Sequence, residues 1–342
     1  MKKITKQCLP ELLDKMAVAY QVYAPLENGG EVNFARWSAG AQPDLVTLKT
    51  AVPAKSVLFP QHETYLHFAR EGKKLSIETV GGETEDFVLF GVRACDAKSF
   101  ALLDKVFLSE PVDQFYASRR EHGTVVAFAC AEPEETCFCR TFAIAAQAPA
   151  GADVCVWEAG EVLLWQAMTA KGERLTSLLD DLLAEAGASE QAALVKVQAK
   201  IRQQLDELPL AHLAATGPKQ DLKKVFADET WLSCSEACLG CGACTYVCPT
   251  CHCYDIHDFD AGERVERSRC WDSCMFSDFT QMAHGNPRTT QKERFRQRFM
   301  HKLVYYPDNY GEIACVGCGR CLEACPVNMN IVKVMKTIGG EA

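Results

Sequence analysis

The sequence predicts an α/β or α+β protein in two parts, an α/β domain over 1–215 and a mostly helical domain over 221–342. Two short apolar runs flank an amphipathic segment near residue 100, which is typical of alternating strands and helices. Helical patterns dominate from residue 161. Thirteen of the 19 cysteines then lie between Cys234 and Cys325, so the second part has a different chemistry.

The first predicted elements form a strand–helix–strand unit. EDFVLFGV (85–92) and GTVVAFAC (123–130) are short, apolar and rich in β-branched residues, as buried strands are. Between them, DAKSFALLDKVFL (96–108) has apolar residues at helical spacing, and Asp96 is placed to cap this helix. This order predicts a βαβ unit within a mostly parallel sheet.

The region that follows predicts helices and then a boundary. Residues 161–207 include ERLTSLLDDLLAEAG and EQAALVKVQAKIRQQLDE, whose Leu and Val residues recur at helical spacing. Pro and Gly residues interrupt this pattern at 209–220. We therefore expect the linker between the two domains there.

Length and charge exclude several classes of protein. A chain of 342 residues is long enough for two domains with their own cores. The net charge of -9 argues against a nucleic-acid partner. No apolar stretch approaches a membrane span, and Glu11, Asp14 and Lys15 interrupt any signal-like apolar region. We expect a cytoplasmic protein, in which reduced thiols favour metal binding over disulfides.

The strongest motif is a repeated cysteine pattern. Cys238, Cys241, Cys244 and Cys248 precede Pro249 with the same spacing as Cys315, Cys318, Cys321 and Cys325 before Pro326. This is the bacterial ferredoxin spacing for [4Fe–4S] clusters, in which the fourth cysteine binds the other cluster. It predicts a first set (Cys238, Cys241, Cys244, Cys325) and a second set (Cys248, Cys315, Cys318, Cys321). A pair of zinc sites is the weaker alternative, because zinc ligands usually come as two separated pairs.

The two motifs are separated by a long insertion, 249–314, with cysteines of its own. Cys251, Cys253, Cys270 and Cys274 could form a further metal site or pack beside a cluster. The insertion ends in a basic run over 288–302. Its default interpretation is a solvated face, and the alternative is that it offsets cluster charge or binds an acidic partner.

A third group of cysteines follows the predicted parallel strands. Cys95 comes after the first strand, and Cys130, Cys137 and Cys139 come at or after the end of the second. The carboxyl ends of parallel strands meet at one edge of a sheet. These four residues, the N-terminal set, therefore predict a third cluster, with buried structural thiols as the alternative.

The motifs resemble a known family of iron–sulfur subunits. The strings CLGCGACTYVCPTCHCYDI, RCWDSCMFSDFTQMAHGNPR, RQRFMHK and CVGCGRCLEACP resemble the β subunits of cytoplasmic NiFe sulfhydrogenases and the A subunits of anaerobic sulfite reductases. GVRACD and the CFC segment resemble the N-terminal signatures of the same family. The resemblance implies a role for the N-terminal set, which favours the third cluster. The family pattern also includes Cys251, Cys253 and Cys274. It also implies two partners, an FAD/NAD(P)-binding subunit and a catalytic subunit.

The sequence contains no motif for substrate chemistry. No G-x-G-x-x-G lies between a strand and a helix, so we expect no FAD or NAD site in this chain. The best hypothesis is a subunit without a catalytic site of its own, which relays single electrons within a cytoplasmic anaerobic oxidoreductase complex. The resemblance leaves open whether this complex is a hydrogenase, a sulfite reductase or a heterodisulfide-reductase-like enzyme. The alternatives are an enzyme that binds substrate at an N-terminal cluster, and a structural or redox-sensing iron–sulfur module.

Overall fold

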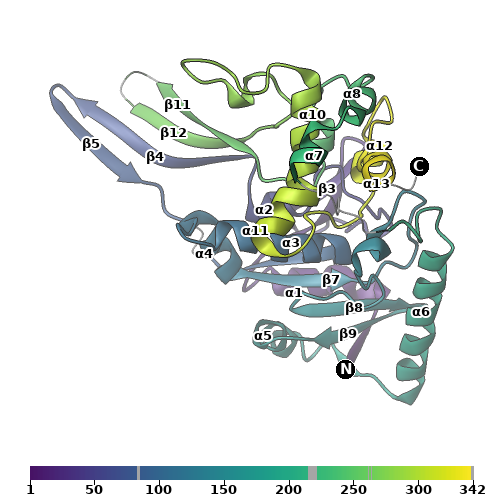
Figure 1. Cartoon of the computed structure of the whole chain (residues 1–342). Coiled ribbons are helices and arrows are strands. Elements are labelled where there is room, and N and C mark those ends of the chain that lie inside the picture. The colour runs from purple at the N-terminus through teal and green to yellow at the C-terminus, as the bar shows by residue number, and fades with distance from the viewer. Residues whose placement is uncertain (83–84, 215–221, 261, 263, 340–342) are drawn as a thin grey trace. The chain divides into compact units, whose positions relative to one another are not determined.

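The computed structural model describes residues 1–82, 85–214, 222–260, 262 and 264–339 (Figure 1). The chain divides into two compact units. The first comprises Met1–Leu58, Glu83–Ala214 and Val316–Gly319; the second comprises Phe59–Gly82, Ala215–Cys315 and Arg320–Ala342. The expected domains 1–215 and 221–342 remain a prediction, and these units differ from them at 59–82 and 316–319. Most of the expected linker, 215–220, lies outside the described residues.

The first unit is built on an eight-stranded sheet in the order β10-β1-β9-β8-β7-β6-β2-β3. Parallel pairing is confined to the centre, between β2 and β6, β6 and β7, and β7 and β8. The βαβ prediction is confirmed, but the sheet is mixed rather than mostly parallel, because hairpins flank both sides of the parallel core. The strands are β1 (Lys2–Thr5), β2 (Gln21–Asn28), β3 (Glu31–Arg36), β6 (Phe87–Arg93), β7 (Gly123–Phe128), β8 (Val154–Ala159), β9 (Val162–Ala167) and β10 (Ala184–Glu185).

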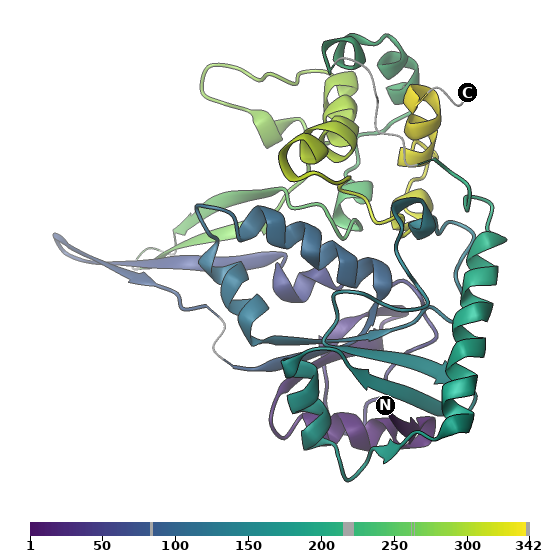
Figure 2. The ribbon, with the colours of Figure 1, turned by 60° about the horizontal axis from the view of Figure 1, so that its bottom comes forward.

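Helices cover both faces of this sheet (Figure 2). Leucines of α1 and α5 share one apolar core with alternate residues of the central strands, such as Val126 and Phe128. The opposite face carries α3, which contacts β6 and β7. The helices are α1 (Leu9–Met16), α2 (Lys55–Leu58), α3 (Ala94–Phe107), α4 (Gln114–His122), α5 (Ala170–Leu178) and α6 (Ala188–Asp206), with short 3₁₀ turns η1 (Lys6–Cys8) and η2 (Cys139–Phe142).

Two sequence predictions about the first unit are wrong in detail. Residues 162–167 form strand β9 rather than helix, because the Val-Leu-Leu-Trp run pairs with both β1 and β8. The residue that caps α3 is Arg93, in extended conformation, and Asp96 lies buried within the first turn instead. The helix begins earlier than predicted because β6 leads directly into it.

The second unit combines short helices with an antiparallel sheet in the order β11-β12-β4-β5. The strands of the insertion were not predicted from the sequence, but helices make up most of the regular structure of this unit. The strands are β4 (His62–Glu71), β5 (Lys74–Thr79), β11 (Tyr254–Asp260) and β12 (Arg264–Trp271). The helices are α7 (Leu222–Ala227), α8 (Thr230–Ser235), α9 (Ala243–Tyr246), α10 (Gln291–Met300), α11 (Tyr306–Tyr310), α12 (Arg320–Glu323) and α13 (Ile331–Gly339), with a 3₁₀ turn η3 (Asp278–Thr280) and a π turn η4 (His301–Tyr305). Within the described residues, none of the helices has the length and apolar character needed to span a membrane.

A buried ion pair joins the β4–β5 hairpin to β12. Arg269 is fully buried, its Nη2 donates to Glu63, and the two residues face each other across the strands. The guanidinium also lies over the rings of Phe59 and Tyr65, at 4.8 and 5.1 Å from the ring centroids. This contact connects segments 206 positions apart in the chain.

We expect Glu63→Gln to lower the free energy of unfolding by about 3–5 kcal/mol, because Arg269 would keep its buried charge without a carboxylate. Asp258→Asn is the matched control, since it removes the exposed partner of Arg267 on the same sheet. Urea unfolding followed by circular dichroism measures both. Equal effects of the two substitutions would contradict this account of the buried pair.

Candidate iron–sulfur sites

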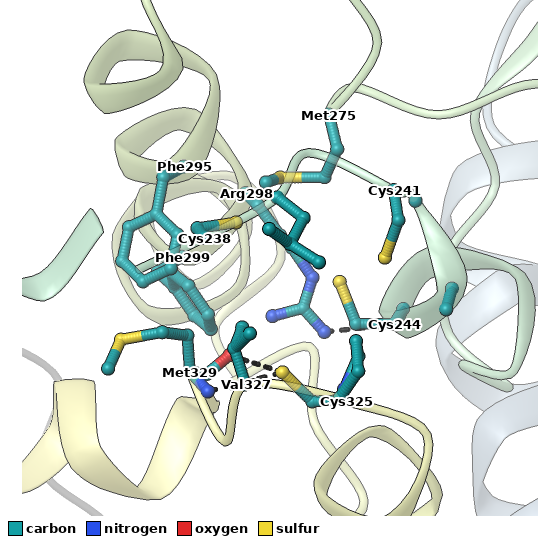
Figure 3. Close-up of a pocket in the computed structure, with 14 residues that line it drawn as sticks. Cys238, Cys241, Cys244, Met275, Phe295, Arg298, Phe299, Cys325, Val327 and Met329 are labelled. Carbon is teal, nitrogen blue, oxygen red and sulfur yellow. Dashed lines mark hydrogen bonds between the residues drawn. The ribbon is translucent and has the colours of Figure 1, made fainter. Parts of the chain in front are cut away.

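The first set of cysteines surrounds one cavity in the second unit. The loop before α9 supplies Cys238 and Cys241, α9 itself supplies Cys244, and the segment after α12 supplies Cys325. Figure 3 shows the four side chains directed toward a common space, which the guanidinium of Arg298 also enters. Cys241 is the exposed member of the set.

Nitrogen donors already point at the thiols of this cavity. Gln291 Nε2 donates to Cys238 Sγ at 3.3 Å, and the backbone N–H of Met329 donates to Cys325 Sγ at 3.1 Å. Four thiols around an open space, with N–H groups aimed at sulfur, fit the ligand shell of a [4Fe–4S] cluster. Such a cluster would supply one-electron redox chemistry here.

The second set is divided between the two units. Cys248, Cys315 and Cys321 belong to the second unit, whereas Cys318 belongs to the Val316–Gly319 segment of the first. Burial raises the pKa of the Cys321 thiol, and Arg298 opposes this effect. The pKa of Cys248 is well below its usual range, first because Cys251 donates to it and then because Lys302 lies nearby, although burial acts the other way.

The N-terminal set gathers in the first unit, as the strand order predicted. Cys95 lies in the first turn of α3, Cys130 follows β7, and Cys137 and Cys139 come from the next loop. They line a cavity together with Cys318, which was not predicted to lie there. Burial raises the pKa of Cys139 to about 12, and the neighbouring thiols Cys130 and Cys137 add to the effect. Four thiols that line one cavity match the ligand number of a third cluster, in which bound iron would replace the thiol protons.

The second ferredoxin motif packs against the Cys137–Cys139 loop inside the first unit. The N–H of Phe138 donates to the carbonyl of Gly317 at 2.8 Å. A Cβ at Gly317 would lie 2.4 Å from the carbonyl oxygen of Phe138, so only glycine allows this approach.

The cysteines of the insertion lie beside the second set. Cys251 donates to Cys248, and Cys253 and Cys274 are hydrogen-bonded to each other. Cys270 is instead on β12, opposite Asp255 of β11. Among the residues that the structure describes, no three Cys, His, Asp or Glu side chains are grouped for a single metal ion. The metal role of Cys251, Cys253 and Cys274 therefore stays a prediction.

The basic run does not form one solvated face. Arg298 is 2% exposed and Lys302 is 4% exposed, and both lie among cysteines. Burial lowers the pKa of His301 to about 4, with repulsion from Lys302 and Arg288 as further causes, so His301 is uncharged near pH 7. The default interpretation was wrong for these residues because α10 and η4 are packed within the unit.

Comparisons with known proteins agree with this geometry. A family model described as a 4Fe-4S dicluster domain matches residues 237–329. The chain is 30% identical over 342 residues to sulfhydrogenase 2 subunit beta of Pyrococcus furiosus, covering 98% of this chain and 97% of the relative. No solved structure matches the chain. The chain is an iron–sulfur protein with a domain for two [4Fe–4S] clusters, and it belongs to the family of sulfhydrogenase β subunits. The predicted resemblance is confirmed.

We expect Gly317→Ala to destabilise the protein more than Gly240→Ala, the same position in the first motif. Both glycines have positive φ, so both substitutions cost about 1–2 kcal/mol in backbone strain. Only Gly317 faces rigid backbone; a Cβ at Gly240 meets the flexible end of Gln291. We expect a further loss of about 1–3 kcal/mol for Gly317→Ala. Urea unfolding of the two variants measures the difference, and equal losses would contradict the packing argument.

Proposed function

We propose that this chain relays single electrons within a hetero-oligomeric oxidoreductase complex. The observation that carries the proposal is the first cysteine set, four thiols around one cavity with N–H donors directed at sulfur. A cubane cluster in such a shell changes charge by one electron with little rearrangement, which suits relay rather than substrate chemistry. The ligands are the first set for one cluster and the second set for the other.

A third [4Fe–4S] cluster on the N-terminal set extends this relay. Its support is the convergence of Cys95, Cys130, Cys137 and Cys139 from a helix, a strand end and a loop. Burial raises the pKa of Cys137, and the charge of Lys49 opposes this effect. Cys318, a member of the second set, lines the same cavity as the N-terminal set.

The proposed partners are a subunit that binds FAD and NAD(P) and a catalytic subunit, in a cytoplasmic complex. The similar protein from Pyrococcus furiosus is named a β subunit of a sulfhydrogenase, which supports a complex of the hydrogenase type. Flavin and nicotinamide on the partner would exchange electron pairs, and the clusters of this chain would pass them on singly.

The iron content tests the cluster assignment. Anaerobically reconstituted protein is expected to contain about 12 iron atoms, four for each of three clusters. Cys139→Ala should lose about four of them, because it removes one ligand of the N-terminal set. Cys8→Ala is the control and should lose none. If the wild type and both variants each contained eight iron atoms, the proposal of a third cluster would be wrong and the relay would consist of two clusters.

Reduction by NAD(P)H tests the division of labour between subunits. We expect the isolated, reconstituted chain to be reduced by dithionite, with visible bleaching, and to remain oxidised when NADH or NADPH is added alone. Adding the flavin-binding subunit should allow the nicotinamide to reduce it. Rapid bleaching of the isolated chain by NADH would contradict the proposed role, because the chain would then hold its own nicotinamide site.

A further inference from the structure

The guanidinium of Arg298 is a positive charge buried beside the first set of cysteines. Arg298 lies on α10, and its side chain enters the cavity lined by the first set (Figure 3). An arginine is always charged in proteins, and burying a charge is costly unless other groups compensate. Some compensating negative charge must therefore lie within this cavity.

Only part of the hydrogen-bonding capacity of the Arg298 guanidinium is satisfied. Nη2 donates to the carbonyl of Cys244 at 3.0 Å. Nε and Nη1 are buried and have no hydrogen-bond partner among the described residues. By contrast, the ammonium of Lys302 donates to Thr250 Oγ1 at 2.7 Å and to the carbonyl of Ala314 at 3.2 Å. Of these two buried cations, Arg298 is the one with two buried N–H groups that have no partner among the described residues.

The position of Arg298 relates it to both cysteine sets of the ferredoxin motifs. Its carbonyl partner Cys244 belongs to the first set, and its side chain is also hydrogen-bonded to Cys321 of the second. Both cysteines and Arg298 lie in the second unit. A fixed cation beside two clusters stabilises the reduced state of each, because reduction adds negative charge.

We propose that Arg298 donates its free N–H groups to cluster sulfur and raises the reduction potentials of the two clusters bound by the ferredoxin motifs. The inference rests on the proposed function, since it needs clusters on the first and second sets. Arg298 would then act through the clusters, because its positive charge affects how readily these two clusters accept an electron.

Potentiometric titration of the reconstituted protein, followed by EPR, tests this inference. We expect Arg298→Gln to make reduction of at least one ferredoxin-motif cluster about tenfold less favourable, which is about 59 mV for one electron. Arg298→Lys keeps the charge and should show a smaller shift. Arg296→Gln is the matched control, because it removes a charge from the same helix where the side chain stacks on Phe226. Unchanged potentials in an Arg298→Gln protein with full iron content would overturn the inference and leave the relay intact.

A second measurement begins with the wild-type protein. Wild-type protein labelled with ¹⁵N-arginine is reduced and examined by pulsed EPR. We expect a ¹⁵N coupling to a reduced cluster that persists in Arg296→Gln and is lost in Arg298→Lys. Absence of the coupling in the loaded wild type would overturn the role of Arg298. Failure of the wild type to bind iron at all would instead contradict the proposed function.

Discussion

The attraction between buried cations and the sulfur of the cysteine sets is the interaction on which the second unit depends. Arg298 and Lys302 are both buried there; burial lowers the pKa of each cation, and the neighbouring cysteines raise it by more. In a protein interior such charges are stable only beside compensating negative charge. Iron–sulfur clusters supply that charge, so cluster binding and folding of this region are expected to be linked.

The helices and strands of each unit hold the cysteine-containing loops so that their thiols line shared cavities. In the first unit, the parallel strands β6 and β7 end on the same side of the sheet, which brings Cys95 and Cys130 together. In the second unit, α9 and α10 hold the first set between them. Most of the candidate ligands come from loops, and the others from the first turn of a helix. The chemistry is therefore set by loop positions on a rigid frame.

The local patterns of the sequence predicted the sites better than the whole fold. Cysteine spacing alone grouped the first set, and the apolar runs at 85–92 and 123–130 placed the N-terminal set, because both signals act over few residues. The mixed sheet and the pairing of β4 with β12 depend on contacts such as Glu63 with Arg269, which join distant segments and leave no local pattern. The burial of Arg298 contradicts only the default interpretation of the basic run, which rested on the rule that a basic residue on a helix usually faces solvent.

Anomalous diffraction from crystals of the anaerobically purified protein, collected at the iron edge, tests the central claim most directly. The account predicts iron peaks enclosed by the first set, by the second set and by the N-terminal set, with Arg298 in contact with cluster sulfur at the first. A map with no iron at the first and second sets, or with zinc at these positions, would contradict the account.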